Sequence, residues 1–227
     1  MDYRGNKLLA ALSREAYEAL SPYFVSCAFA QGVVLAEAGD PVEYVYFPLS
    51  GMISIVVVMK DGKAVETATV GRDGVFGAMA GFGAYVTKFR AIVQVPITAI
   101  RIPSAQFAKV VQKSKELQFL CVTFNEFLLV QARVTAACNA LHKVEERFCR
   151  WLLQTRETTG CDTITLTQEF LSEMLGVRRT SITDVASRLQ SSGIISYSRG
   201  VIRIIDLAAL EGLSCECFET LREQSAI

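Results

Sequence analysis

The sequence has a single histidine and little else from which a metalloenzyme could be built. Cupin-like enzymes hold their metal with several histidines of the β-roll, and His142 lies outside any β-rich segment. A Walker loop, a G-x-S-x-G nucleophile elbow and an H-E-x-x-H motif are all absent. The sequence therefore predicts a protein that is not an enzyme and that holds neither a metal nor another cofactor.

Excess charge of either sign is also lacking, because 23 Lys and Arg residues balance 23 Asp and Glu residues. A protein that coats nucleic acid without selectivity is usually strongly basic, so that class is disfavoured. A small reading head with local charge remains compatible with the balance.

C-x-x-C pairs are missing among the seven cysteines, and an odd, scattered set argues against a disulfide framework. We expect most of these thiols to be small buried side chains in a reducing compartment. Cys215 and Cys217 form a close pair that could bind a metal or respond to oxidants. Residues two apart on a helix point about 200° apart, however, so a structural role on the expected C-terminal helix is favoured.

Long uninterrupted apolar runs are few. The strongest, residues 44–59, is broken by Pro48, Ser50 and Gly51, and a bilayer span needs about 20 apolar residues. The N-terminus leads into an amphipathic helix, expected over residues 8–20, rather than into a signal-peptide core. The sequence predicts a soluble cytoplasmic protein without a membrane partner.

Short β-rich runs separated by glycines fill residues 24–103, which is typical of a sandwich or jelly roll. A long helix is expected over residues 116–142, then a hinge near 139–143, a helix over 143–157 and a last helix over 206–224. Apolar positions of the long helix recur at steps of three and four, as in a two-stranded coiled coil. The predicted dimer interface is Leu117, Leu120, Phe124, Phe127, Gln131, Val134, Cys138 and Leu141.

Gln131 would fix the register of this seam at some cost in stability. Residues off the seam, namely Phe119, Val122, Leu128 and Val130, could pack on the β-sandwich. The alternative is an ordinary core helix that buries one stripe, but two apolar faces favour two partners.

Residues 166–189 are the most informative segment. Two amphipathic helices flank Gly176-Val177, where glycine permits a sharp turn. Their expected inward faces are Phe170, Leu171, Met174 and Leu175, then Ile182, Val185, Ala186 and Leu189. A β-hairpin over residues 193–205, with its tip at Gly200, completes a winged helix. Thr167 and Gln168 are expected to cap the first of the two helices. The predicted DNA-contacting residues are Thr167, Gln168, Arg178, Arg179, Thr180, Ser181, Thr183, Asp184, Arg188, Ser198 and Arg199.

This order of elements, with the motifs at 163–169, 193–195, 39–41, 46–51 and 61–62, resembles the CRP/FNR family of bacterial transcription regulators. The resemblance implies an α+β fold: an N-terminal jelly-roll β-roll effector domain (1–115), a dimerisation helix and hinge (116–142) and a C-terminal winged helix-turn-helix (143–227). It implies a homodimer that reads an inverted repeat in double-stranded DNA, with RNA polymerase as a further partner. Arg179 stands where members commonly contact a guanine, whereas Thr180 and Asp184 depart from the usual Glu and Arg, so the half-site should differ from the best-known one.

Cyclic-AMP sensors of the family carry a Gly-Glu pair and then Arg-Ser or Arg-Thr to hold the ribose and the cyclic phosphate. The equivalent positions here are Gly77-Ala78 and Arg90-Ala91, so the acid and the hydroxyl are both missing. Cyclic-AMP sensors of the family also offer hydroxyl groups of the long helix to the adenine. The equivalent place here falls near Ala132 and Arg133, which have no hydroxyl. We expect a degenerate or altered effector pocket, in which Lys88 and Arg90 could hold a different anion or merely be solvated. A regulator that still binds cyclic AMP or cyclic GMP is the alternative.

Other sensor chemistries of the family fit less well. An iron–sulfur branch needs an N-terminal cysteine cluster, and only Cys27 lies in that region. A haem branch needs a histidine in the β-roll, whereas His142 is expected at a helix end or hinge. The sequence therefore does not identify the effector.

Overall fold

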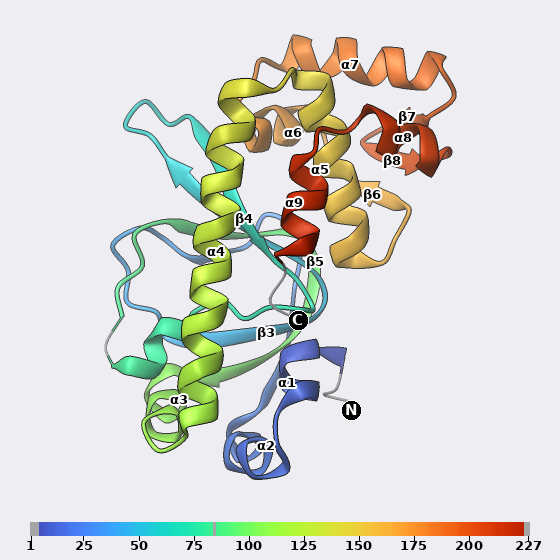
Figure 1. Cartoon of the computed structure of the whole chain (residues 1–227). Coiled ribbons are helices and arrows are strands. Elements are labelled where there is room, and N and C mark those ends of the chain that lie inside the picture. The colour runs from blue at the N-terminus through green and yellow to red at the C-terminus, as the bar shows by residue number, and fades with distance from the viewer. Residues whose placement is uncertain (1–4, 84, 225–227) are drawn as a thin grey trace. The chain divides into compact units, whose positions relative to one another are not determined.

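The computed structural model describes residues 5–83 and 85–224. It has an N-terminal β-sheet domain, one long helix and a C-terminal helix-turn-helix with a small sheet, so the predicted fold class is confirmed (Figure 1). Contacts divide the described chain into two compact units. One contains the residues up to Ile55 and Ala68–Leu129, and the other contains Val56–Thr67 and Val130–Gln224. The sequence prediction placed residues 56–67 in the N-terminal domain (1–115), whereas their contacts group them with the C-terminal unit.

The larger sheet is built around two long neighbouring strands. Its order is β1-β5-β3-β4, and β2 pairs with β5. β1 runs antiparallel to β5, with Val25 opposite Arg101. The strands are β1 (Val25–Phe29), β2 (Val34–Ala36), β3 (Tyr44–Val58), β4 (Ala64–Val70) and β5 (Arg90–Pro103).

Gly51 lets β3 continue against its neighbour. Its φ is +72°, and a Cβ at this position would lie 2.1 Å from the carbonyl oxygen of Pro96. A side chain is therefore excluded both by the backbone conformation and by the close approach of β5.

The predicted helix over residues 8–20 is wrong as a single element. Two short helices form instead, α1 (Lys7–Ala11) and α2 (Arg14–Leu20), followed by the 3₁₀ turn η2 (Ser21–Tyr23). Leu12 is extended between them, and the Ser13 side chain accepts a hydrogen bond from the N–H of Ala16. Serine is a strong helix N-cap, so it starts a new helix where apolar spacing alone suggested continuity.

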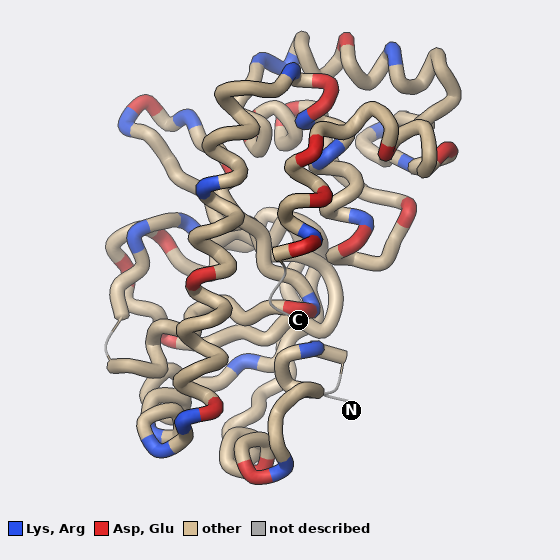
Figure 2. Tube along the Cα trace, in the orientation of Figure 1, with Lys and Arg blue, Asp and Glu red and all other residues tan. Residues whose placement is uncertain are grey.

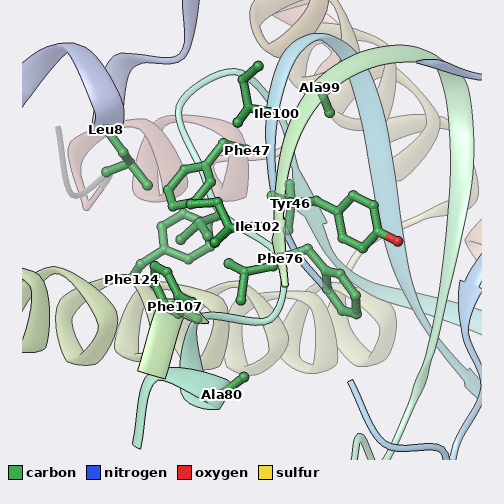
Figure 3. Packing of buried hydrophobic residues seen from close by; sticks show 14 of the residues in the cluster. Leu8, Tyr46, Phe47, Phe76, Ala80, Ala99, Ile100, Ile102, Phe107 and Phe124 are labelled. Atoms are coloured by element: carbon green, nitrogen blue, oxygen red, sulfur yellow. The ribbon is translucent and has the colours of Figure 1, made fainter. Parts of the chain in front are cut away.

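The core of the first unit lies between the sheet and the helices η3 (Ala78–Phe82), α3 (Ser104–Val111) and α4 (Lys115–Leu141). Figure 3 shows Phe47, Ile102, Phe107 and Phe124 gathered there, and the rings of Phe47 and Phe107 are 6.1 Å apart. Burial of these apolar side chains contributes to the stability of this unit.

α4 departs from the prediction in part of each apolar face, although Leu128 packs against the core of the first unit as expected and Leu141 of the predicted seam is 79% exposed. Leu117 and Phe124 are buried in the core of their own unit, and Cys138 is buried in the second unit. Gln131 is also buried, so these four members of the predicted seam are not free for a partner. Phe119 and Val122, which were expected to pack on the sheet, are instead 73% and 54% exposed. Both stripes recur at steps of three and four, and only the packing of the sheet decides which of them it covers.

α4 is also long and apolar enough to cross a bilayer by length and composition alone. The sequence prediction of no membrane span rests on residues 44–59 and does not cover this helix. Only 17% of its most apolar window is buried in the single chain.

The second unit contains α5 (Val144–Thr159), the helix-turn-helix α6 (Gln168–Leu175) and α7 (Arg179–Ser191), and a sheet of order β6-β8-β7. Its strands are β6 (Thr163–Thr165), β7 (Ile195–Ser198) and β8 (Val201–Ile204). The predicted helix over 206–224 is wrong as one element, because α8 (Leu207–Leu213) and α9 (Cys217–Glu223) are separate. Ser214 is extended, with φ −75° and ψ 151°, and this interrupts the helix beside Cys215.

The tip of the β3–β4 hairpin packs within this second unit. The indole N–H of Trp151 on α5 donates to a carboxylate oxygen of Glu66 at 3.0 Å, and both side chains are buried. At Gly176, a Cβ would lie 3.2 Å from a methyl group of Val65. The hairpin tip is therefore part of the support of the helix-turn-helix.

Candidate nucleic-acid interface

The helix-turn-helix is fixed by caps at its turn. The Thr167 side chain accepts a hydrogen bond from the N–H of Phe170 at 3.2 Å and caps α6, as predicted. Gly176 ends α6 in the left-handed region, with φ +61°, and the N–H of Val177 donates to the carbonyl oxygen of Ser172 at 2.9 Å. This C-terminal cap turns the chain sharply into α7, which is the turn that the sequence required.

The inward faces of both helices are as predicted, apart from a half-buried Phe170. The remaining members are Leu171, Met174 and Leu175 on α6 and Ile182, Val185, Ala186 and Leu189 on α7, each no more than 3% exposed. Packing of these side chains sets which face of α7 is left to solvent. That face carries Arg178, Arg179, Thr180, Thr183, Asp184 and Arg188, all exposed, with Ser181 half-buried at its edge.

A hollow of about 400 Å³ brings residues from three elements together. Thr167 and Gln168 come from the start of α6, Arg179 from the start of α7, and Arg199 from the wing. Three of these side chains can donate hydrogen bonds from charged or amide groups, and two are arginines. The hollow therefore suits a phosphate oxygen of a nucleic-acid backbone.

The wing is a tight hairpin between β7 and β8. Arg199 has a φ of +49° and Gly200 of +77°, as a two-residue turn of type I′ needs. The N–H of Leu166 donates to the carbonyl oxygen of Gly200 at 2.7 Å, which ties the wing to the segment before α6. Arg199 is thereby held at the hollow together with Thr167, and Ser198 is exposed beside it in the chain.

Some predicted contact residues are already engaged within the domain. Arg188 forms an ion pair with Glu145, with Nε 3.0 Å from the carboxylate. The hydroxyl of Thr183 lies 2.9 Å from the side-chain oxygen of Gln168 and 3.1 Å from the carbonyl oxygen of Arg179. Gln168 thus braces α6 against α7, and does not cap α6 as the sequence suggested.

Sequence reasoning missed Tyr197 and Glu169, which also line the hollow. The Tyr197 hydroxyl donates to the carbonyl oxygen of Leu166 at 3.1 Å. Burial raises the pKa of Tyr197, and the nearby charge of Arg179 acts in the opposite direction. Nothing in a single tyrosine of a predicted strand distinguishes it, because its place in the hollow comes from strand register.

The surface around α7 has no uniform excess of positive charge among the described residues, because basic and acidic side chains are mixed on it. Figure 2 shows basic and acidic segments mixed along the whole trace, with both signs on α7. A second hollow places Lys63 of the β3–β4 hairpin with Arg178 and Ser181, beside Glu169 and Glu173. Attraction to phosphate must therefore come from the placement of individual arginines.

The predicted effector residues occupy the first unit. Gly77 precedes η3 with a φ of +87°, and Ala78 is 5% exposed. Arg90 is half-buried, and its Nε lies 3.0 Å from the carboxylate of Glu37. Lys88 is exposed and Ala91 is buried. Arg90, the arginine that an anion would need, is thus already paired with the acid Glu37, which is not among the predicted effector residues.

Comparison with known protein families matches both halves of the chain. Residues 27–114 match the cyclic nucleotide-binding domain family, and residues 146–213 match the Crp-like helix-turn-helix domain family. Neither description names a catalytic domain.

Similar whole proteins support the same arrangement. The global nitrogen regulators of Synechocystis and Nostoc are each 23% identical, over 89% and 88% of this chain and 93% of their own length. FixK2 from Bradyrhizobium japonicum has a TM-score of 0.71 at 16% identity, over 85% of this chain and 98% of that one. A CRP/FNR-family transcriptional regulator from Thermus thermophilus has a TM-score of 0.68 at 23% identity, over 84% and 98% of the two chains.

Proposed function

The chain belongs to the CRP/FNR family of transcription regulators, and on that premise we propose that it reads an inverted-repeat DNA site as a homodimer. The observation that carries the proposal is the hollow formed by Thr167, Gln168, Arg179 and Arg199. It places hydrogen-bond donors for a phosphate from α6 and from the wing beside the first turn of α7. A helix flanked in this way can enter a major groove while its neighbours hold the sugar–phosphate backbone.

Within this arrangement, Arg179 is the residue that we assign to base recognition. It is exposed in the first turn of α7, where recognition helices contact base edges. A guanidinium that donates to O6 and N7 of guanine contributes about 1–3 kcal/mol of discrimination. Arg178, Thr180, Ser181 and Asp184 are the remaining side chains within reach of the groove.

The exposed stripe of α4 supports the dimer. Phe119, Val122, Glu126 and Leu129 follow steps of three and four, and the three apolar members are 73%, 54% and 41% exposed. A second copy related by a two-fold axis would cover this stripe. A bilayer is the poorer cover, because exposed Glu126 and Arg133 would each cost about 2.5–3.5 kcal/mol at its centre. Two copies of α7 would then face half-sites about 34 Å apart.

The effector pocket is proposed to be altered rather than competent for cyclic AMP. The support is the pair of Arg90 with Glu37 and the alanines at 78 and 91. The alternative, a cyclic-nucleotide-responsive regulator, is favoured by the match of residues 27–114 to the cyclic nucleotide-binding domain family. Titration calorimetry with cyclic AMP and cyclic GMP separates the two, since micromolar binding would support the alternative. We also propose that the protein acts in the cytoplasm and that RNA polymerase is a further partner.

Selection of bound fragments from genomic DNA tests the function directly. The purified full-length protein should enrich a palindromic motif. The Arg179→Ala variant should lose selectivity at one position of each half-site by about 10- to 100-fold. The Arg199→Ala variant should bind all sequences more weakly and lower the salt slope by about 1. Arg14→Ala, which removes the same charge from an exposed site on α2, is the matched control.

Failure has a clear signature. If the wild-type protein enriches no motif at moderate salt, with or without cell extract as a source of effector, sequence-selective DNA binding is refuted. If Arg179→Ala and Arg14→Ala behave alike, Arg179 is not the reading residue.

A further inference from the structure

Four potential metal ligands meet where the long helix ends. Cys138, His142, Cys215 and Cys217 each offer one ligand atom, and these atoms all lie within 4.8 Å of one another. The three cysteines are buried, and the side chain of His142 is 16% exposed. All four belong to the second unit, and the function proposed above uses none of them.

Two segments far apart in the sequence bring the ligands together. The N–H of His142 donates to the carbonyl oxygen of Cys138 at 3.1 Å, so these two residues lie one helical turn apart on one face. Cys215 lies in the extended link after α8, and Cys217 begins α9. The break at Ser214 removes the helical geometry that would have pointed Cys215 and Cys217 apart.

Two of the distances between ligand atoms are close to those of a tetrahedral site. With zinc–sulfur bonds of about 2.3 Å and zinc–nitrogen bonds of about 2.0–2.1 Å, a tetrahedron separates two sulfurs by about 3.8 Å and a sulfur and a nitrogen by about 3.6 Å. The Sγ atoms of Cys138 and Cys215 are 3.5 Å apart, and Cys217 Sγ is 3.6 Å from Nδ1 of His142.

The surroundings of the histidine also suit a metal. Nε2 of His142 lies 3.1 Å from a carboxylate oxygen of Glu216, the residue between the two cysteines. A proton held on Nε2 by that carboxylate leaves the lone pair of Nδ1 directed at the sulfurs. Carboxylates bound to the second nitrogen of a ligand histidine are usual at zinc sites.

Buried positive charge stands beside the thiols. Arg147 and Arg150 are 7% and 4% exposed, and within the described residues neither Nε has a hydrogen-bond partner. Both guanidinium groups are close enough to the Cys138 thiol to interact with it electrostatically. A zinc ion with three thiolates carries one net negative charge, which would compensate a buried guanidinium.

We propose that Cys138, His142, Cys215 and Cys217 form a closed Cys₃His site for a thiophilic divalent metal of the zinc class. Four protein ligands leave no open position, so the site is structural rather than catalytic. A bound metal would fasten the link between α8 and α9 to the end of α4, next to the hinge before α5. The inference does not depend on the proposed DNA function, and either could fail without the other.

Metal analysis of the full-length protein, purified under reducing conditions, tests the site. We expect one zinc ion per chain, and replacement by cobalt should give the visible absorption bands of a tetrahedral thiolate complex. Cys215→Ser should abolish the cobalt spectrum, while Cys161→Ser, at an exposed cysteine outside the cluster, should leave it unchanged. Glu216→Gln should keep the stoichiometry and weaken zinc affinity by about 10- to 100-fold.

The opposite results are equally distinct. Failure of the reduced wild-type protein to take up zinc or cobalt would overturn the proposal, whether or not the variants fold. A disulfide between Cys138 and Cys215 in the purified protein, with no metal uptake after its reduction, would also overturn it. So would a cobalt spectrum that survives in Cys215→Ser.

Discussion

Replacing Phe119 by alanine should weaken the dimer and leave the fold intact. Phe119 is 73% exposed on α4, so little of its ring contributes to the stability of the single chain. Full burial of a phenylalanine side chain contributes about 1.5–3 kcal/mol, so covering the exposed part contributes about 1–2 kcal/mol. In a two-fold dimer both copies of Phe119 are replaced, so the dimer loses about 2–4 kcal/mol.

This loss corresponds to a dimer dissociation constant raised about 30- to 1,000-fold, at 1.4 kcal/mol for each tenfold change. Sedimentation equilibrium over a range of protein concentrations measures it. Phe82→Ala is the matched control, because Phe82 is 46% exposed but lies on η3 rather than on α4.

Phe124→Ala distinguishes the two faces of α4. Phe124 is 2% exposed in its own unit, so its removal should cost about 3–5 kcal/mol of folding stability. An unchanged dimer constant for a folded Phe119→Ala protein would refute the assignment of the interface. A dimer lost in Phe124→Ala at unchanged thermal stability would restore the face predicted from the sequence.

Three further changes test other parts of the structure. Gly51→Ala should lower the thermal midpoint markedly, because the new Cβ would lie 2.1 Å from the Pro96 carbonyl oxygen at a φ of +72°; an unchanged melt would show that β3 and β5 can separate there. Thr167→Ala should cost about 1 kcal/mol in denaturant unfolding through loss of the α6 cap, and Thr167→Ser should restore most of it. Burial raises the pKa of Cys121 to about 12, so native alkylation at pH 8 should label exposed Cys161 first; equal labelling rates by mass spectrometry would contradict the packing.

The helix-turn-helix could be predicted closely because local signals agreed. The turn glycine at 176, the cap at Thr167 and the periodic faces all depend on residues near one another in sequence. The wing could be predicted for the same reason, because the turn residues of a short hairpin are a local sequence signal. Confirmation of these elements shows where local chemistry decides the structure.

Features that depend on distant packing could not be predicted in this way. Phe119 and Phe124 both belong to stripes with steps of three and four, and periodicity does not say which stripe the sheet covers. Arg90 meets Glu37, 53 positions away, and Cys138 meets Cys215, 77 positions away. Neither pairing has a local signature. The sequence therefore does not predict the cluster around His142 as a set, although it contains each of the four residues in a predicted helix or hinge.

The grouping of the hairpin tip with the C-terminal unit limits how the chain can be cut. A fragment that begins at the hinge would lack residues 56–67. The indole of Trp151 would then lose its hydrogen bond to the carboxylate of Glu66, and α5 would lose the packing of the hairpin tip. A chimera that exchanges reading heads within the family should accordingly carry residues 56–67 along with the head. Trp151 is the only tryptophan of the chain, so its fluorescence reports whether that graft has seated.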